Sequence, residues 1–170
     1  IKSYIRTLMK TSDITELKEL LSTSKNVVIV PHRTPDGDAI GASLAIYHYL
    51  ANKGHNATVV APNDYPDFLK WLPDSKNTYK FDMQNRQSKR AIDEASLIFL
   101  LDFNALHRVG DDMQQTLEKF EGDFVMIDHH QQPDNIAKYL FSDTSICSTC
   151  QMVYHFIEFL DDVNSINADI

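Results

Sequence analysis

The fold is decided by the stretch Val27-Val28-Ile29-Val30-Pro31-His32-Arg33-Thr34-Pro35-Asp36-Gly37-Asp38-Ala39-Ile40-Gly41-Ala42. Its first four residues are apolar and β-branched, which predicts a short buried strand. Two prolines and a glycine then interrupt any regular element, so a loop begins where the strand ends. The loop carries His32, Asp36 and Asp38, whose imidazole and carboxylate groups bind divalent ions. We therefore interpret it as part of a metal site.

The composition is that of one globular domain. At 170 residues, with 43% hydrophobic and 24% charged residues, the chain is long enough for a single domain with a real core and short for two. The net charge of -8 argues against a long surface that tracks the phosphates of duplex DNA. A small phosphorylated substrate remains compatible, because bound metal ions supply positive charge locally.

No stretch has the features of a membrane span or a secretory signal, because the apolar runs are far shorter than the roughly 20 residues that cross a bilayer. Cys147 and Cys150 are too few for a disulfide framework, which indicates a reducing compartment. They form one C-x-x-C pair with no second pair nearby, so we do not expect zinc there. We expect a cytoplasmic protein without membrane contact.

Hydrophobic periodicity predicts strands that alternate with helices. Strands are predicted at 27–31, 56–61, 94–102, 124–130 and 138–141. Helices are predicted at 1–10, 11–21, 39–53, 84–91, 109–120 and 148–160. The segment 64–72 is a compact loop or short helix, in which Phe68 and Trp71 suit either base stacking or the core. We favour the core, where aromatic residues at this spacing are more often found.

Three of these strands end in side chains that bind metals. One runs into the loop with His32, one ends at Asp102, and one ends at Asp128-His129-His130. Strands that alternate with helices imply right-handed crossovers and a mostly parallel sheet, whose carboxyl ends share one edge and bind ligands there. We therefore predict a three-layer α/β fold, with a mostly parallel twisted sheet, helices on both faces and one site at the sheet edge.

The motifs are weak singly, because Asp-Gly is a common turn pair and a His-His pair often lies on a surface. In this combination and order they resemble the DHH phosphoesterase superfamily, which includes RecJ-like proteins. Residues 32–42 resemble its first motif, Asp102 its second and Asp128-His129-His130 its third. The sequence Pro-Asp-Gly-Asp-Ala-Ile-Gly is similar to the first motif of the branch that contains bacterial oligoribonuclease/pAp phosphatases. Manganese pyrophosphatases usually have a hydroxyl residue in the position of Gly37.

The resemblance implies a Rossmann-like fold and a hydrolase with two divalent cations, usually manganese. Carried over by motif, the ligands would be His32 and Asp36 for one ion, Asp38 and His129 for the other, and Asp102 for both. Asp128 would support the site from behind, and His130 would contact the phosphate. Independently of the family, mixed His and Asp ligands favour manganese or a similar ion over calcium, which prefers oxygen ligands alone.

Candidate phosphate contacts are Arg33, His107 and Arg108. The spacing of Arg108 from Asp102 resembles the surroundings of the family's second motif, although an exposed arginine that opens a helix explains it equally well. The implied substrates are short single-stranded oligonucleotides or phosphorylated nucleotides such as 3'-phosphoadenosine 5'-phosphate (pAp). Two alternatives stay open. One is a pyrophosphate or polyphosphate hydrolase, and the other is a nucleotide-binding regulatory module without catalysis.

The resemblance also predicts the domain organisation. Residues 1–170 would form the DHH catalytic domain, and we allow for a homodimer. Family members continue with a fourth motif, which holds another metal-binding Asp in a Thr-Asp-Thr-Gly context, and with a smaller substrate-binding domain. Asp143 precedes the last predicted helix, so we interpret it as a cap or turn residue. We therefore expect weak or no turnover from these 170 residues alone.

Overall fold

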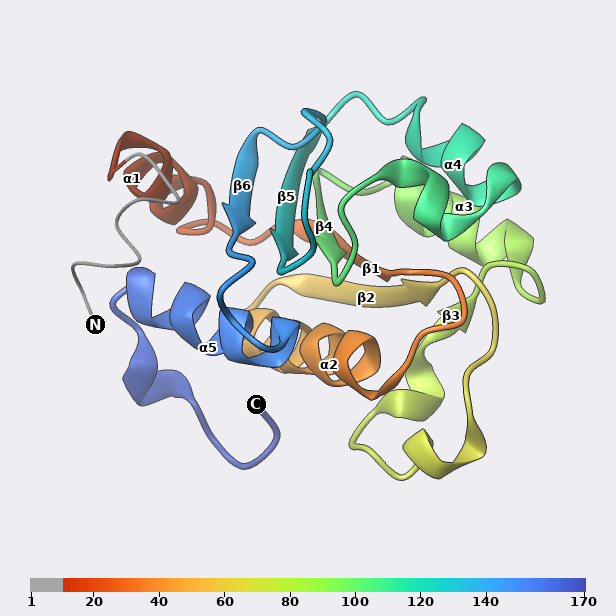
Figure 1. Cartoon of the computed structure of the whole chain (residues 1–170), viewed down its shortest axis with the longest axis horizontal. Helices are drawn as coiled ribbons and strands as arrows, with labels where there is room; N and C mark the ends of the chain where they lie inside the picture. Colours follow the sequence, from red (N-terminus) through yellow and green to blue (C-terminus); the bar gives the residue numbers. More distant parts are fainter. Residues whose placement is uncertain (1–10) are drawn as a thin grey trace.

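The computed structural model describes residues 11–170, and its centre is a six-stranded sheet (Figure 1). The strands are β1 (Asn26–Pro31), β2 (Asn56–Ala61), β3 (Tyr79–Lys80), β4 (Leu97–Leu101), β5 (Asp123–Asp128) and β6 (Tyr139–Ser142). Their order is β3-β2-β1-β4-β5-β6, and every neighbouring pair is parallel. The chain builds outward from β1 in one direction and then from β4 in the other. Such a reversal opens a crevice beyond the carboxyl ends of the two central strands.

Helices cover both faces of the sheet. They are α1 (Thr11–Leu20), α2 (Gly37–Asn52), α3 (Asn85–Asp93), α4 (Asp111–Leu117) and α5 (Thr149–Phe159). Helices α2 and α5 lie on one face, together with Leu17 of α1, and α3 and α4 lie on the other (Figure 1). Within residues 11–170, no helix is both long and apolar enough to cross a membrane.

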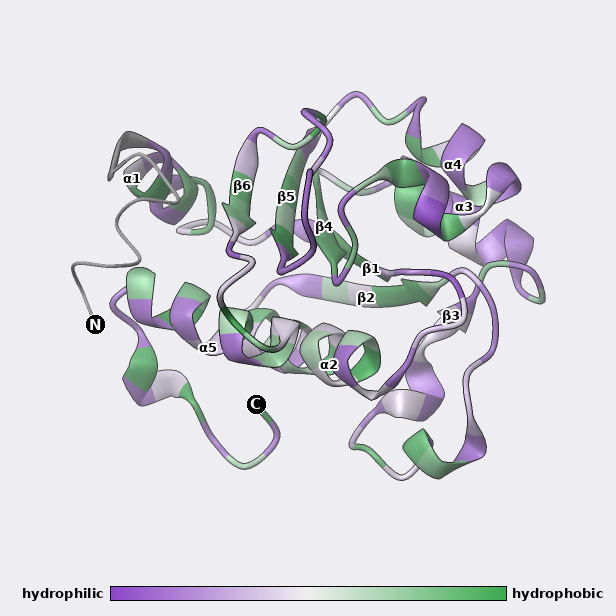
Figure 2. Ribbon diagram, viewed as in Figure 1, coloured by the Kyte–Doolittle hydropathy of each residue, from purple (hydrophilic) through white to green (hydrophobic). Residues whose placement is uncertain are grey.

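The strands read as continuous apolar runs because both of their faces are buried. Ile29 and Phe99 pack in the core beneath α2 and α5, whereas Val28 and Ile98 pack in the core beneath α3 and α4. Side chains alternate along a strand, so a strand between two helical layers needs apolar residues at every position. Figure 2 shows the hydrophobic central strands between helices of mixed hydropathy. The predicted three-layer α/β fold is confirmed.

Most predicted elements are found within a few residues of their expected bounds, and the helix predicted at 1–10 lies outside the described residues. The helix predicted at 109–120 is partly wrong. A short 3-10 turn (η4, Leu106–Val109) comes first, and α4 begins only after Gly110, whose φ of 85° ends the turn. The two-residue strand β3 was not predicted, because two residues show no periodicity.

The assignment of Phe68 and Trp71 to the core is wrong. Their exposed fractions are 71% and 77%. The segment forms a 3-10 turn (η2, Asp67–Leu69), in which Leu69 is the buried residue. A turn this short buries one side chain and leaves its neighbours in solvent.

Candidate metal centre

The predicted metal loop joins the end of β1 to the start of α2. Asp36 caps this helix, since its Oδ1 accepts hydrogen bonds from the backbone N–H of Asp38 (2.9 Å) and of Ala39 (3.1 Å). The cap fixes the carboxylate at the positive end of the helix dipole, where negative charge is stabilised. The loops after β4 and β5 reach the same sheet edge.

Two clusters of metal-binding atoms meet at Asp102. One cluster contains His32, Asp36 and Asp102, and the other contains Asp102, His129 and His130; within each, the ligand atoms lie within 4.8 Å of one another. His32 Nε2 is 3.5 Å from Asp102 Oδ2, and His129 Nε2 is 3.5 Å from Asp102 Oδ1. Each carboxylate oxygen of Asp102 therefore faces a different histidine. A carboxylate placed in this way is suited to bridge two cations.

The tautomers of the histidines fit metal binding. Nδ1 of His32 lies 2.8 Å from the carbonyl oxygen of Arg33, and Nδ1 of His129 lies 3.2 Å from that of Ile146. A carbonyl oxygen only accepts, so we assign the proton of each neutral ring to Nδ1. Nε2 is then left with a lone pair aimed at the Asp102 carboxylate. Two lone pairs that face each other at 3.5 Å are a natural place for a cation.

Asp102 is held firmly at the end of β4. It is 2% exposed, its φ of 65° lies in the left-handed region, and its backbone N–H donates to the carbonyl of Ile127. The Thr149 hydroxyl donates a 2.6 Å hydrogen bond to Asp102 Oδ1. Burial raises the pKa of Asp102, but hydrogen bonds from the His32 ring in its protonated form and from the Thr149 hydroxyl outweigh burial and leave the pKa below its usual value. The residue therefore stays an anion, as a metal ligand must.

Asp38 lies beside the second cluster and also binds the start of α5. Its Oδ2 is 3.8 Å from His129 Nε2, which brings it toward the cluster without making it a member. Oδ2 accepts from the backbone N–H of Thr149 (2.7 Å), and Oδ1 accepts from that of Cys150 (2.9 Å). The amino end of α5 thus orients this carboxylate.

Thr149 is the site residue that the sequence analysis missed. It follows the N-cap residue of α5, Ser148, and is the first residue of the helix. Thr149 is fully buried and hydrogen-bonded to both Asp38 and Asp102. The sequence offers no signal for this role, because it depends on where α5 packs.

Asp128 contacts His130, which is a member of the second cluster. The buried Asp128 carboxylate accepts from the backbone N–H of His130 (3.0 Å) and lies 2.7 Å from its Nδ1. These contacts fix the ring and leave Nε2 directed away from Asp128. This arrangement is compatible with the predicted role of Asp128 as a support and of His130 as a phosphate contact.

The three candidate phosphate contacts lie next to the first cluster. Arg33 follows His32 directly, and its backbone N–H donates to the carbonyl of Arg108 (2.8 Å). Arg33, His107 and Arg108 are all exposed. Asp143 forms a turn in which its Oδ1 accepts from the backbone and hydroxyl of Ser145.

The chain is similar to several known proteins. A model described as the DHH family N-terminal domain matches residues 26–170. The chain is 32% identical over 134 residues to the bifunctional oligoribonuclease and PAP phosphatase NrnA of Thermus thermophilus, a match covering 79% of this chain and 37% of the relative. It is 24% identical over 152 residues to the cyclic-di-AMP phosphodiesterase GdpP of Bacillus subtilis, covering 84% of this chain and 22% of the relative.

Among solved structures, an exopolyphosphatase-related protein from Bacteroides fragilis is similar, with a TM-score of 0.89 and 36% sequence identity. That match covers 95% of this chain and 48% of the other. The chain thus spans less than half the length of each of these relatives. The family match covers most of the chain and leads to one conclusion. The chain belongs to the DHH family, and residues 26–170 correspond to the N-terminal domain of that family.

Proposed function

We propose that the whole protein is a metal-dependent phosphoesterase that hydrolyses short oligonucleotides, pAp, or both. The observation that carries this proposal is the position of Asp102, whose two carboxylate oxygens each face a different histidine at 3.5 Å. Such a carboxylate suits a pair of closely spaced cations, which is the usual requirement of two-metal phosphoryl hydrolysis.

Each side chain has a distinct part in this proposal. His32 and Asp36 would hold one cation, Asp38 and His129 the other, and Asp102 both. Manganese suits the mixed nitrogen and oxygen donors. Bound there, two cations lower the pKa of a shared water and polarise a phosphoryl oxygen. His130, oriented by Asp128, would contact the phosphate.

The choice of nucleotide substrates rests on the Thermus relative, whose name describes an oligoribonuclease and PAP phosphatase. The exposed Arg33 and Arg108 beside the first cluster would bind further phosphates. The thiols of Cys147 and Cys150 are unpaired, which fits work in the reducing cytoplasm. Because the chain spans less than half the length of each relative, we expect residues 1–170 alone to hydrolyse the substrate weakly or not at all.

The test uses the full-length protein, stripped of metal and then supplied with Mn²⁺. It is assayed in parallel on pAp, a short RNA, cyclic di-AMP and pyrophosphate. Asp102→Asn should abolish turnover, whereas Asp93→Asn, a change of an exposed carboxylate on α3, should leave it unchanged. Hydrolysis of pyrophosphate alone would contradict the proposal and identify the protein as a pyrophosphatase. No hydrolysis of any substrate would indicate a binding module.

A further inference from the structure

Two large aromatic side chains stand in solvent on the segment that follows β2. Phe68 and Trp71 are 71% and 77% exposed. Successive 3-10 hydrogen bonds link Pro66 to Leu69, Asp67 to Lys70 and Leu69 to Leu72. Trp71 follows Phe68 by three residues on this turn. Contiguous exposed apolar surface can mark a binding site, which makes this pair a candidate.

This segment is packed against the metal loop. Asn63 Oδ1 accepts a 2.7 Å hydrogen bond from the backbone N–H of Thr34. A Cβ placed on Gly37 would lie 3.7 Å from Leu69 Cδ2, so the residue between the two rings touches the start of α2. Figure 1 shows the segment running beside the beginning of that helix, and Figure 2 shows its hydrophobic turn at the molecular surface. The segment that carries the two rings therefore borders the loop of the candidate metal centre.

The segment is anchored well enough to act as a platform. Leu69 is buried, and the buried Tyr65 donates a 2.6 Å hydrogen bond from its hydroxyl to the carbonyl of Ser75. Lys70 Nζ lies 2.9 Å from a carboxylate oxygen of Asp64 and 2.8 Å from one of Asp67. These contacts fix the backbone that carries both rings. A fixed backbone lowers the conformational entropy that is lost when a ligand stacks on the rings.

A hollow of about 370 Å³ adjoins Trp71, and its lining includes two lysines. Its residues are Lys70, Trp71, Leu72, Pro73, Asp74, Lys76 and Asn77. Lys70 is already paired with Asp64 and Asp67, so Lys76 is the cation that this lining, which also contains Asp74, offers to a phosphate. A flat ring beside a cation suits a nucleotide, whose base stacks while its phosphate meets the ammonium group.

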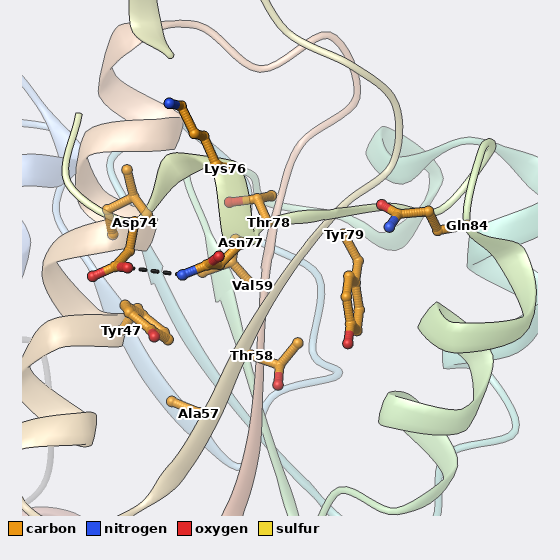
Figure 3. Close-up of a pocket in the computed structure, with 11 residues that line it drawn as sticks. Tyr47, Ala57, Thr58, Val59, Asp74, Lys76, Asn77, Thr78, Tyr79 and Gln84 are labelled. Atoms are coloured by element: carbon orange, nitrogen blue, oxygen red, sulfur yellow. Dashed lines mark hydrogen bonds between the residues drawn. The ribbon is translucent and has the colours of Figure 1, made fainter. Parts of the chain in front are cut away.

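A second hollow, of about 410 Å³, shares Asp74, Lys76 and Asn77 with the first and is drawn in Figure 3. The Asn77 side-chain amide donates a 2.8 Å hydrogen bond to Asp74 and stiffens the turn that holds both residues. The second hollow is lined by Tyr47 in the middle of α2 and by the first half of β2, away from the carboxyl ends of the strands. The aromatic pair is the better candidate because it adjoins the metal loop.

We infer that Phe68 and Trp71 stack on bases of the nucleotide substrate while its reacting phosphate lies at the metal centre. The inference rests on the proposed function and adds to it a determinant of substrate specificity. It predicts that the enzyme gains affinity from the base and that an abasic phosphodiester binds poorly.

The test measures KM and kcat of the full-length protein on pentaadenylate and on an abasic phosphodiester of equal length. Phe68→Ala and Trp71→Ala should each raise KM for pentaadenylate about five- to a hundredfold and leave kcat within about twofold, because base stacking on aromatic residues is sequence-tolerant binding energy. Both constants for the abasic substrate should stay unchanged. Tyr154→Ala removes a 46% exposed ring on α5 and serves as the matched control.

Fluorescence separates this inference from the proposed function. Trp71 is the single tryptophan of the 170 residues, and subtracting the signal of Trp71→Phe isolates its emission in the full-length protein. Quenching of the Trp71 emission by pentaadenylate without hydrolysis would support base stacking and contradict the proposed phosphoesterase activity. Hydrolysis without quenching or any change in KM would overturn stacking. A lower Tm in both alanine variants with an unchanged KM would also overturn it and assign the rings to packing against the rest of the protein.

Discussion

The Thr149 hydroxyl donates a 2.6 Å hydrogen bond to Oδ1 of Asp102, although the two residues are 47 positions apart. Thr149 also donates its backbone N–H to Asp38. One residue at the start of α5 therefore positions two carboxylates of the candidate centre. Its hydroxyl is the part that a mutation can remove without disturbing the helix.

We predict that Thr149→Val weakens Mn²⁺ binding about tenfold, because removing a hydrogen-bond partner of a metal ligand usually costs ten- to a hundredfold in affinity. Calorimetric titration of the metal-free protein measures the change. Thr149→Ser keeps the hydroxyl and should recover most of the affinity. If the Thr149→Val and Thr149→Ser variants bind Mn²⁺ with equal affinity, the hydroxyl does not orient Asp102.

Asp128→Asn tests the role of His130. The buried Asp128 carboxylate fixes the His130 ring through a 2.7 Å contact with Nδ1. We expect kcat to fall about ten- to a hundredfold while the number of bound Mn²⁺ ions stays the same. Metal analysis beside steady-state kinetics measures both quantities. A loss of bound metal would instead make His130 a ligand, since its ring lies within the second cluster.

Gly110→Ala tests the placement of Arg33. Gly110 has a φ of 85° and a ψ of 156°, a conformation that side chains rarely adopt, and a Cβ there would lie 3.3 Å from Arg33 Cδ. We expect a loss of about 1–3 kcal/mol in unfolding free energy and a higher KM. Gly54→Ala is the control, because Gly54 has a φ of 83° and nothing within 4 Å of a Cβ. Urea unfolding should show strain in both variants, and kinetics should show a KM change in Gly110→Ala alone.

His55 makes stability depend on pH. Burial lowers the pKa of His55, and its Nδ1 accepts the backbone N–H of Lys25, so the folded protein favours the neutral ring. The unfolded chain then binds more protons as pH falls, and this contribution to stability is present above pH 6.5 and lost below it. In metal-free protein, His55→Gln should flatten the fall in unfolding free energy between about pH 7 and pH 5. Equal slopes in both proteins would contradict this prediction.

Local pattern was enough to predict every strand of the sheet except the two-residue β3. Residues such as Val28 and Ile29 belong to opposite cores, and burial on both faces produces the continuous apolar runs that identify a central strand. The gathering of His32, Asp102 and His129 followed from the rule that parallel strands end at one edge. Their assignment to individual ions stays a prediction.

The rest depended on tertiary contacts that no short pattern encodes. Phe68 is of a residue type that is common in protein cores. However, its neighbour Leu69 occupies the single buried position of the turn. Thr149 reads as an ordinary helix-start residue until α5 is packed beside α2. Both misses depend on packing between distant segments, because Leu69 rather than Phe68 lies beside Gly37, and Thr149 contacts Asp38 and Asp102.

The bonds between Asp38 and the start of α5 have a consequence for the order of events during synthesis. They join residues 111 and 112 positions apart. A ribosome delivers the chain from its amino end, so the metal loop leaves it long before α5 exists. A nascent chain that ends short of Thr149 carries the ligands but lacks the helix that orients two of them. We therefore expect the proposed centre to bind metal tightly only after α5 has docked.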